Sequence, residues 1–167
     1  MRHDIPLCNN ANESSFMIWK PHVTVAAVIE QDAHFLLVEE RVDADAPLVL
    51  NQPAGHLDPG ESLAEAVIRE TLEETAYHFQ PEALIAIYRW PLPDNSRTYL
   101  RFAFTGHITG HVPDRPLDEG IARCLWLTHA EIEAAATRLR SPLVLRALAD
   151  YRAGRRQPLD MLIDVGS

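Results

Sequence analysis

Apolar runs in the first third of the chain predict three strand-like segments. Residues 22–30, HVTVAAVIE, are β-branched and almost entirely apolar, which is typical of a strand buried on both faces. A short polar turn then leads into residues 34–40, so the two segments predict a β-hairpin. Residues 48–51 form a short third strand, and the turn that we expect at residues 53–55 follows it.

The rest of the chain adds three strands and three helices. Residues 83–90 and 98–105 flank a proline-containing loop and predict two strands, and residues 122–127 alternate in polarity like another. Two helices are expected near the C-terminus, a short one over residues 129–136 capped by Thr128 and a last one over residues 142–153 opened by its proline. Mixed strands with a central helix and C-terminal helices predict an α/β sandwich.

The central helix carries the most informative residues. Ser62 and Glu65 form a capping box that marks its start. At about 100° per residue, Glu70, Glu73 and Glu74 fall within an arc of roughly 100°. Carboxylates gathered in this way repel one another unless a cation lies in front of them, and hard divalent cations such as Mg²⁺ prefer oxygen ligands. An isolated Glu-x-x-Glu-Glu, however, is more often a solvated helix face.

We expect this helix to pack one side on the sheet and to turn its acidic stripe outward. The side predicted to pack consists of small and apolar residues: Ala64, Val67, Ile68, Thr71, Leu72 and Thr75.

The spacing around the stripe favours a site over a solvated face. The pattern is G-x5-E-x7-R-E-x-x-E-E, with its fixed positions at Gly55, Glu61, Arg69, Glu70, Glu73 and Glu74. This segment resembles the Nudix box, the signature of the Nudix hydrolase superfamily. The resemblance implies the Nudix α/β/α sandwich with a mixed central sheet. It also implies a metal-dependent hydrolase of a nucleoside diphosphate linked to another moiety.

The same resemblance implies a role for each fixed residue. The three glutamates would ligate Mg²⁺ or Mn²⁺, aided by the carbonyl of Gly55. Arg69 and Glu61 would pair and hold the loop against the helix. The family pattern ends in Glu-Glu-x-Gly-aliphatic, whereas this chain has Ala76 and Tyr77, and Thr71 takes an aliphatic position. Because alanine resists the positive φ of a helix-ending glycine, we expect the helix to run on slightly before it turns.

A second resemblance, to the NudJ phosphatase branch of the superfamily, extends over about residues 20–150. It is carried by the segments KPHVTVA (20–26), NQPAGHL (51–57), LRF (100–102) and LRSPLV (139–144). It implies hydrolysis of nucleoside tri- and diphosphates with release of inorganic phosphate, and action on hydroxymethylpyrimidine pyrophosphate, the thiamine pyrimidine precursor. One alternative is release of pyrophosphate or cleavage of an ADP-sugar. Another is a Nudix-fold module that binds a nucleotide as a sensor.

Hydrolysis of a phosphoanhydride also needs a base and donors to the phosphates. Repulsion among clustered carboxylates pushes their pKa values apart, so Glu73 or Glu74 can act as base while the others hold metal. Glu119, in the loop over residues 116–120, is a further candidate, with a solvated loop acid as its ordinary interpretation. The candidate substrate-binding cations are Lys20, Arg41 and Arg101, each of which could equally be ordinary surface charge.

The length of 167 residues suits one domain, which we place at residues 19–154 between a flexible arm (1–18) and a C-terminal tail (155–167). The net charge of −9 argues against sequence-independent binding of nucleic acid. It also means that an anionic substrate needs cations to reverse the local charge. The expected partner is therefore a small phosphorylated molecule.

The two cysteines, Cys8 and Cys124, make neither a disulfide framework nor a zinc site, so the cytoplasm is the expected compartment. No apolar run approaches the ~20 residues of a membrane span, and no membrane partner is expected. For the assembly state we expect a monomer, with a dimer as the alternative.

Overall fold

The computed structural model describes residues 19–43 and 45–165. The arm predicted at residues 1–18 lies outside the described residues. Within them, seven strands form one sheet in the order β3-β2-β1-β6-β5, with β4 paired to β1 and β7 to β2. The elements are β1 (His22–Gln31), β2 (His34–Glu40), β3 (Val49–Asn51), β4 (Ala54–His56), α1 (Leu63–Thr75), β5 (Tyr77–Pro91), β6 (Thr98–His111), β7 (Ile121–Thr128), α2 (His129–Ala134), η1 (Ala136–Arg138), α3 (Leu143–Arg152) and η2 (Leu159–Met161).

Strand β1 is the centre of the sheet and is buried on both faces, as its apolar run predicted. It pairs in parallel with β6 and antiparallel with β2 and β4, which makes the sheet mixed. Val25, Ala27 and Ile29 contribute to one hydrophobic core, and Val28 contributes to the other. The period-2 alternation of a strand distributes these residues between the two faces.

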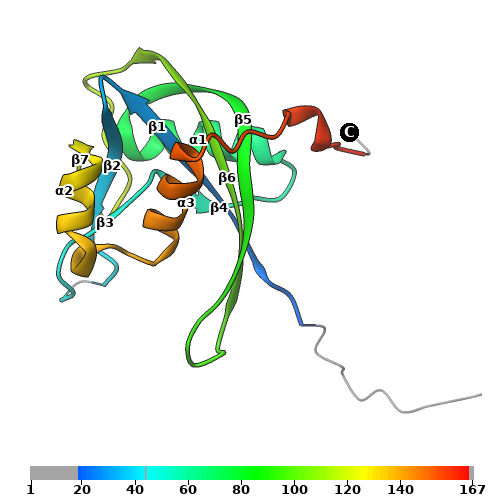
Figure 1. The fold of residues 1–167 in the computed structure, drawn as a ribbon, viewed down its shortest axis with the longest axis horizontal. Coiled ribbons are helices and arrows are strands. Elements are labelled where there is room, and N and C mark those ends of the chain that lie inside the picture. Colours follow the sequence, from blue (N-terminus) through cyan, green and yellow to red (C-terminus); the bar gives the residue numbers. More distant parts are fainter. Residues whose placement is uncertain (1–18, 44, 166–167) are drawn as a thin grey trace, which may run out of the picture.

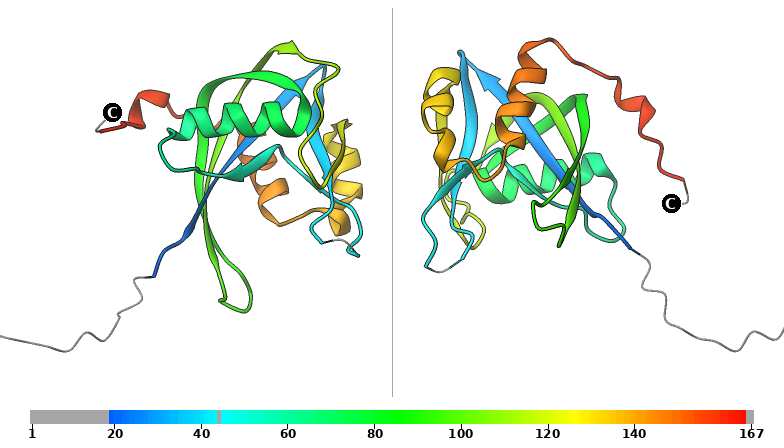
Figure 2. Two further views of the ribbon diagram at one scale, coloured as in Figure 1. Left: turned by 180° about the vertical axis from the view of Figure 1, so that it is seen from behind. Right: turned by 60° about the horizontal axis from the view of Figure 1, so that its bottom comes forward.

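Helices cover both faces of the sheet, so the predicted α/β/α sandwich with a mixed sheet is confirmed. Helix α1 places Ala66 and Val67 in the core on one face. Helices α2 and α3 place Ile132, Val144 and Leu148 in the core on the other face, where all three are fully buried. Figure 2 shows α1 lying across the sheet on the side opposite to α2 and α3. Burial of each such aliphatic side chain contributes about 1.5–3 kcal/mol.

Strands β5 and β6 form a hairpin longer than the sequence predicted. Pairing runs from Tyr77 opposite His111 to Pro91 opposite Thr98, with register shifts that include one at Pro81. A proline has no N–H to donate to the neighbouring strand, and a bulge accommodates it at this position. Because the bulge interrupts the alternation of side chains, the sequence pattern predicted only residues 83–90 of this strand. The tip of this hairpin projects beyond the helices (Figure 1).

Helix α1 begins as predicted and ends earlier than predicted. The capping box at its start is complete, since Ser62 accepts from the N–H of Glu65 and Glu65 accepts from that of Ser62. The expectation that the helix runs on past its family end point is wrong. Ala76 adopts the left-handed conformation with φ of 60° and caps the helix as a glycine would. Its carbonyl accepts from the N–H of Val112 at 2.9 Å, so sheet pairing stabilises a conformation that alanine disfavours.

The outward orientation of the acidic stripe is also wrong for two of its residues. Glu70 and Glu74 are 9% and 8% exposed, whereas Leu72 is only partly buried. The buried face of α1 is therefore rotated toward the glutamates. The reason is that residues 53–55, expected as a turn, enter a short strand at Ala54, and β4 lies against this side of the helix.

The segment after α3 returns to the sheet. Leu84 and Gln157 exchange two backbone hydrogen bonds of 2.9 and 2.7 Å, and Leu159 packs against the core beneath α1. Buried Asp150 of α3 binds Arg155 at 3.1 Å, which ties the start of this segment to the helix. No helix in the described ranges is long and apolar enough to cross a membrane.

Candidate active site

Arg69 is the hub of an ion-pair network between α1 and the loop before it. Its guanidinium donates two hydrogen bonds to Glu61, at 2.9 and 2.7 Å, which is the pairing that the family resemblance implies. It also donates to the carboxylates of Glu70 at 2.8 Å and Glu73 at 3.0 Å, and to the carbonyl of His56 at 3.0 Å. A single arginine thus fixes the loop, the end of β4 and two glutamates of the stripe.

The carboxylates of Glu70 and Glu74 are held in a poorly hydrated place between α1 and β4. Burial raises the pKa of Glu74 to about 9, and the nearby charges of Glu70, Glu40 and Asp118 add to the increase. Burial likewise raises the pKa of Glu70. The N–H of Ala54 donates to Glu74 at 2.8 Å, which is a partial compensation. Burial disfavours the ionised form of both acids, and a cation bound beside them would stabilise that form.

Gly55 sits directly against the Glu70 carboxylate. A Cβ atom at position 55 would overlap that carboxylate, so the close approach of β4 to α1 requires glycine here. The backbone of β4 therefore lies beside the stripe, as expected if the Gly55 carbonyl joins the site.

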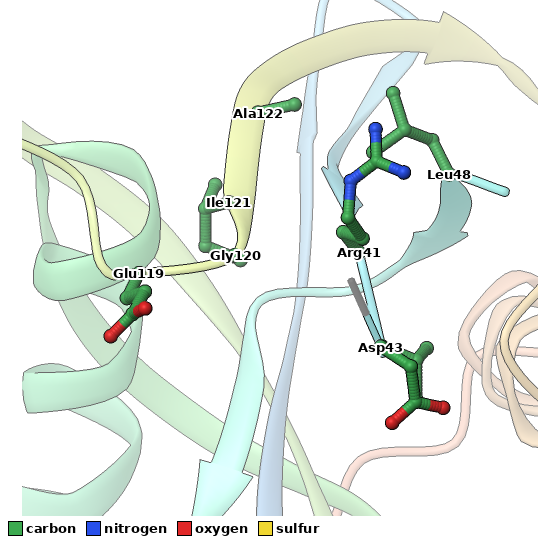
Figure 3. A pocket seen from close by; sticks show the side chains of 8 residues that line it. Arg41, Asp43, Leu48, Glu119, Gly120, Ile121 and Ala122 are labelled. Atoms are coloured by element: carbon green, nitrogen blue, oxygen red, sulfur yellow. The ribbon is translucent and has the colours of Figure 1, made fainter. Parts of the chain in front are cut away.

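The loop over residues 116–120 reaches the stripe through Asp118. Its N–H donates to the Glu73 carbonyl at 3.1 Å, and its charge raises the pKa values of Glu70 and Glu74. The sequence singled out Glu119 in this loop. Glu119 instead lines a cavity of about 620 Å³ together with Arg41, and the two side chains point apart (Figure 3). The sequence did not single out Asp118, because the pattern of a loop does not show which of two adjacent acids faces the stripe.

The candidate cations are not gathered in one place. The Arg41 guanidinium donates to the carbonyl of Ala46 at 2.7 Å, at the rim of that cavity. Lys20 is exposed just before β1 and lines neither cavity described here. Arg101 is 8% exposed and lines a second cavity of about 500 Å³ that also contacts Ala54 and Gly55. Of the three, only Arg101 shares a cavity with the residues of the box.

The carboxylate cluster fits a hard divalent cation by its chemistry, although the described residues do not present a ready cage. In the described part of the chain, no three His, Cys, Asp or Glu side chains are gathered so that they could hold a metal ion. Arg69 engages Glu70 and Glu73 in this arrangement and supplies the positive charge that they need. The side chains of Glu70, Glu73 and Glu74 and the backbone carbonyl of Gly55 offer only oxygen atoms, the ligand type that Mg²⁺ and Mn²⁺ prefer. The assignment of Glu70, Glu73, Glu74 and Gly55 as ligands stays a prediction.

Comparison with known proteins decides the family. The family profile described as NUDIX domain matches residues 20–148. The chain belongs to the Nudix family. It is 42% identical over 147 residues to Phosphatase NudJ of Escherichia coli K12, an alignment that covers 88% of this chain and 94% of that protein. The same name and identity apply to a protein of Shigella flexneri.

Solved structures agree with this assignment. A NUDIX hydrolase from Nitrosomonas europaea superimposes with a TM-score of 0.86 at 53% identity, covering 89% of this chain and all of that one. The NUDIX domain of Shewanella oneidensis NrtR, solved with ADP ribose, gives 0.65 at 18% identity, covers 87% of this chain and 94% of that one, and shares the fold alone. The predicted Nudix recognition and the predicted enzyme class, a Nudix hydrolase, are confirmed. Nudix hydrolases act on pyrophosphate bonds of small phosphorylated substrates and generally use a divalent metal.

Proposed function

We propose that this Nudix hydrolase uses Mg²⁺ or Mn²⁺ to hydrolyse nucleoside tri- and diphosphates with release of inorganic phosphate, and also acts on hydroxymethylpyrimidine pyrophosphate. The observation that carries the proposal is the pair of buried acids held against β4, with Glu70 beside Gly55 and Glu74 bonded to the N–H of Ala54. The similarity to Phosphatase NudJ over 88% of the chain supports orthophosphate as the product. The proposed domain, residues 19–154, contains every residue of this site.

The metal would be held by the carboxylates of Glu70, Glu73 and Glu74 and by the carbonyl of Gly55. When bound, a divalent cation neutralises phosphate oxygens and lowers the pKa of water. The role of Arg69 follows from its contacts. Since it holds Glu61, Glu70 and Glu73 together, it fixes the direction in which the carboxylates point and offsets part of their repulsion.

Two carboxylates of the stripe are candidates for the base that takes a proton from the attacking water. Glu73 has the more exposed side chain, at 27%, so water can approach its carboxylate. Glu74 is buried and bonded to the N–H of Ala54, so its position is fixed. Glu119 stays a third candidate through its loop. On the substrate side, Arg101 is the strongest candidate because it opens into the cavity beside β4, and Arg41 and Lys20 are the outer candidates.

A product assay tests the proposal. The purified protein with MgCl₂ is supplied with nucleoside tri- and diphosphates, hydroxymethylpyrimidine pyrophosphate and an ADP-sugar, and orthophosphate is measured with and without added pyrophosphatase. Orthophosphate without pyrophosphatase supports the proposal. Orthophosphate only after pyrophosphatase, or cleavage of the ADP-sugar alone, contradicts it. No turnover with either metal over the whole panel favours a nucleotide-binding sensor.

A further inference from the structure

The segment after α3 has one side on the domain and one side exposed to solvent. Leu159 and Leu162 pack against the core under α1, which holds the segment in place. The other large side chains at its end are 52%, 78% and 93% exposed, in the order Met161, Ile163 and Val165. Figure 1 shows this end of the chain running outward beyond β5. Three large apolar side chains exposed within five residues indicate a surface that another protein covers.

This segment and the start of α1 enclose an apolar recess of about 250 Å³. Leu63 and Ala64 of α1 line one wall, and Met161 and Ile163 contribute to the other, where Asp164 also lies. The volume is below the ~300 Å³ at which small-molecule sites begin. The recess therefore suits an inserted apolar side chain, and a cation beside that side chain would meet Asp164.

The same face of the sheet carries a side chain of the kind that the recess accepts. Ile87 of β5 lies opposite Phe102 of β6, which packs against the core under α1, so Ile87 points to the α1 side of the sheet. It is 47% exposed and does not line the recess of its own chain. Arg89 is also exposed and lies on the same face, about 7 Å further along the strand. One face thus presents an apolar side chain beside a cation and an apolar recess beside an acid.

We propose that a second copy of this chain docks on this face. Ile87 of each copy enters the recess of the other, and Arg89 of each lies beside Asp164 of the other. Because the exchange is reciprocal, two-fold symmetry closes the contact and produces a dimer rather than a filament. The dimer, which the sequence left as the alternative to a monomer, is the assembly that this surface favours.

The approach of a second copy to β5 is open. This strand is the last in the sheet, and in the described part of the chain only Gln157 pairs with its outer edge, opposite Leu84. Ile87 and Arg89 lie beyond that bridge, toward the tip of the hairpin.

Charge favours a second copy over an anionic occupant. The recess has Asp164 on its wall and Asp160 exposed nearby, and the chain carries a net charge of −9. Anionic lipid head groups and nucleic acid would be repelled by these acids. Arg89, by contrast, forms no ion pair within the described ranges, so it is available to an acid of another copy. Complementary charges at the rim of an apolar contact fix its register.

Sedimentation equilibrium of the purified chain tests the dimer. The measured mass should approach twice that of one chain as the concentration rises, with a dissociation constant of about 10 µM or tighter. A mass that stays at one chain up to about 100 µM, ten times that value, overturns the proposal. The measurement needs no turnover, so its outcome is separate from that of the proposed function.

Variants at the apolar contact locate the surface. Ile87→Asp and Ile163→Asp each place a charge in it and should weaken association about tenfold or more. Both side chains are exposed in the single chain, so the melting temperatures should stay close to that of wild type. Val112→Asp is the control, because Val112 is also exposed but bonds to Ala76 at the opposite end of α1. Association unchanged in both isoleucine variants, or weakened equally in the control, overturns the proposal.

A charge exchange tests the register of the contact. Arg89→Asp and Asp164→Arg each bring like charges together and should weaken association, whereas the double variant should recover most of the wild-type affinity. Arg152→Asp makes the same charge change at an exposed position of α3, on the other face of the sheet, and should leave association unchanged. A double variant that associates no better than the weaker single variant shows that the two residues do not meet, and overturns the proposal.

Discussion

The carboxylate of Glu70 lies in the space that a side-chain carbon at position 55 would need. This relationship joins a strand residue to a helix residue fifteen positions later, and only glycine permits it. It brings the backbone of β4 beside the acids of α1. The Nudix pattern places glycine at this position, and the structure supplies the steric reason in this chain.

Gly55→Ala therefore tests the contact between β4 and α1. The new methyl group must displace the Glu70 side chain, whose end can rotate away at modest cost, so we expect a loss of about 0.5–3 kcal/mol in stability. We expect a much larger loss of turnover, about a hundredfold, because a displaced carboxylate misplaces catalytic geometry. Melting curves and orthophosphate release measure the two effects. The control is Gly154→Ala, which strains the backbone at a φ of 76° but lies away from the site, so it lowers stability without touching the cluster. Equal loss of activity in both variants contradicts the role of Gly55.

The pH dependence of stability tests the burial of Glu74. In metal-free protein the folded-state pKa is raised from 4.5 to about 9, so the unfolded chain loses its proton first as the pH rises. The free energy of unfolding should fall between pH 4.5 and 9, since the unfolded state binds fewer protons there. Glu74→Gln cannot ionise and should flatten this decline, while hydrolysis drops by orders of magnitude. Melting curves are recorded over this pH range in a chelating buffer. If the stability of wild type and of Glu74→Gln falls equally steeply with pH, Glu74 is hydrated in the folded protein.

Mg²⁺ should stabilise the folded protein by relieving repulsion among these acids. A cation at about 100 times its dissociation constant adds about 2.7 kcal/mol. The effect should grow with pH, because protons compete with the cation for Glu70 and Glu74. Glu70→Gln and Glu74→Gln should each reduce it, whereas Glu82→Gln, on an exposed part of β5, should not. Melting temperatures measured across a Mg²⁺ titration decide the matter, and an unchanged shift in Glu70→Gln would remove that residue from the metal site.

Parallel variants distinguish the candidate bases. Glu119 lines a cavity with Arg41 and points away from it (Figure 3). Glu73, by contrast, belongs to the network of Arg69. We expect Glu73→Gln to lower kcat by about 10²–10⁴-fold and Glu119→Gln by less than about tenfold. Single-turnover rates at saturating Mg²⁺ provide the comparison. A large loss in Glu119→Gln with little change in Glu73→Gln would move the base to the loop.

Sequence patterns predicted the parts of this fold that local chemistry determines. The capping box at Ser62 and the cap at Thr128 are both formed, because the bonds that make them join residues three apart. The buried run of β1 and its hairpin were found for the same reason. Ala76 was misjudged because its strain is offset by pairing with Val112, thirty-six residues away.

The arrangement of the candidate site could not be predicted from the sequence. Spacing along α1 gathers three glutamates, but it does not show that β4 covers two of them. Arg101 and Asn51 have buried polar atoms without a partner among the described residues, and these could not be found from sequence, since their environment is made by segments distant in the chain. The segment LRSPLV was noted only as a resemblance, although it brings Arg140 and Ser141 to the cavity.

Glu39 offers a last test, because it links the sheet to the segment that leads into the cavity wall. This buried acid of β2 binds Arg123 of β7 at 2.8 Å and also pairs with Arg138 of η1. The hydrogen bond from Arg123 is the main reason that the pKa of Glu39 is lowered. The stability it contributes is therefore present above about pH 4.5, the value in the unfolded chain, and is lost as the pH falls through the lower folded-state value.

Glu39→Gln should remove that acid-range loss and cost about 1–3 kcal/mol at neutral pH, where two arginines lose their charged partner. Because Arg138 precedes Arg140 and Ser141 of the cavity wall, the variant should also raise KM for the substrate more than it lowers kcat. Glu133→Gln, an exposed acid of α2, is the matched control. Denaturant titrations between pH 3 and 7, combined with steady-state kinetics, separate the two effects. A raised KM in Glu39→Gln without loss of stability would place Glu39 in contact with substrate. Lost stability with an unchanged KM would mean that other bonds hold the cavity wall. One such bond is the hydrogen bond that Gln52 donates to the Val144 carbonyl.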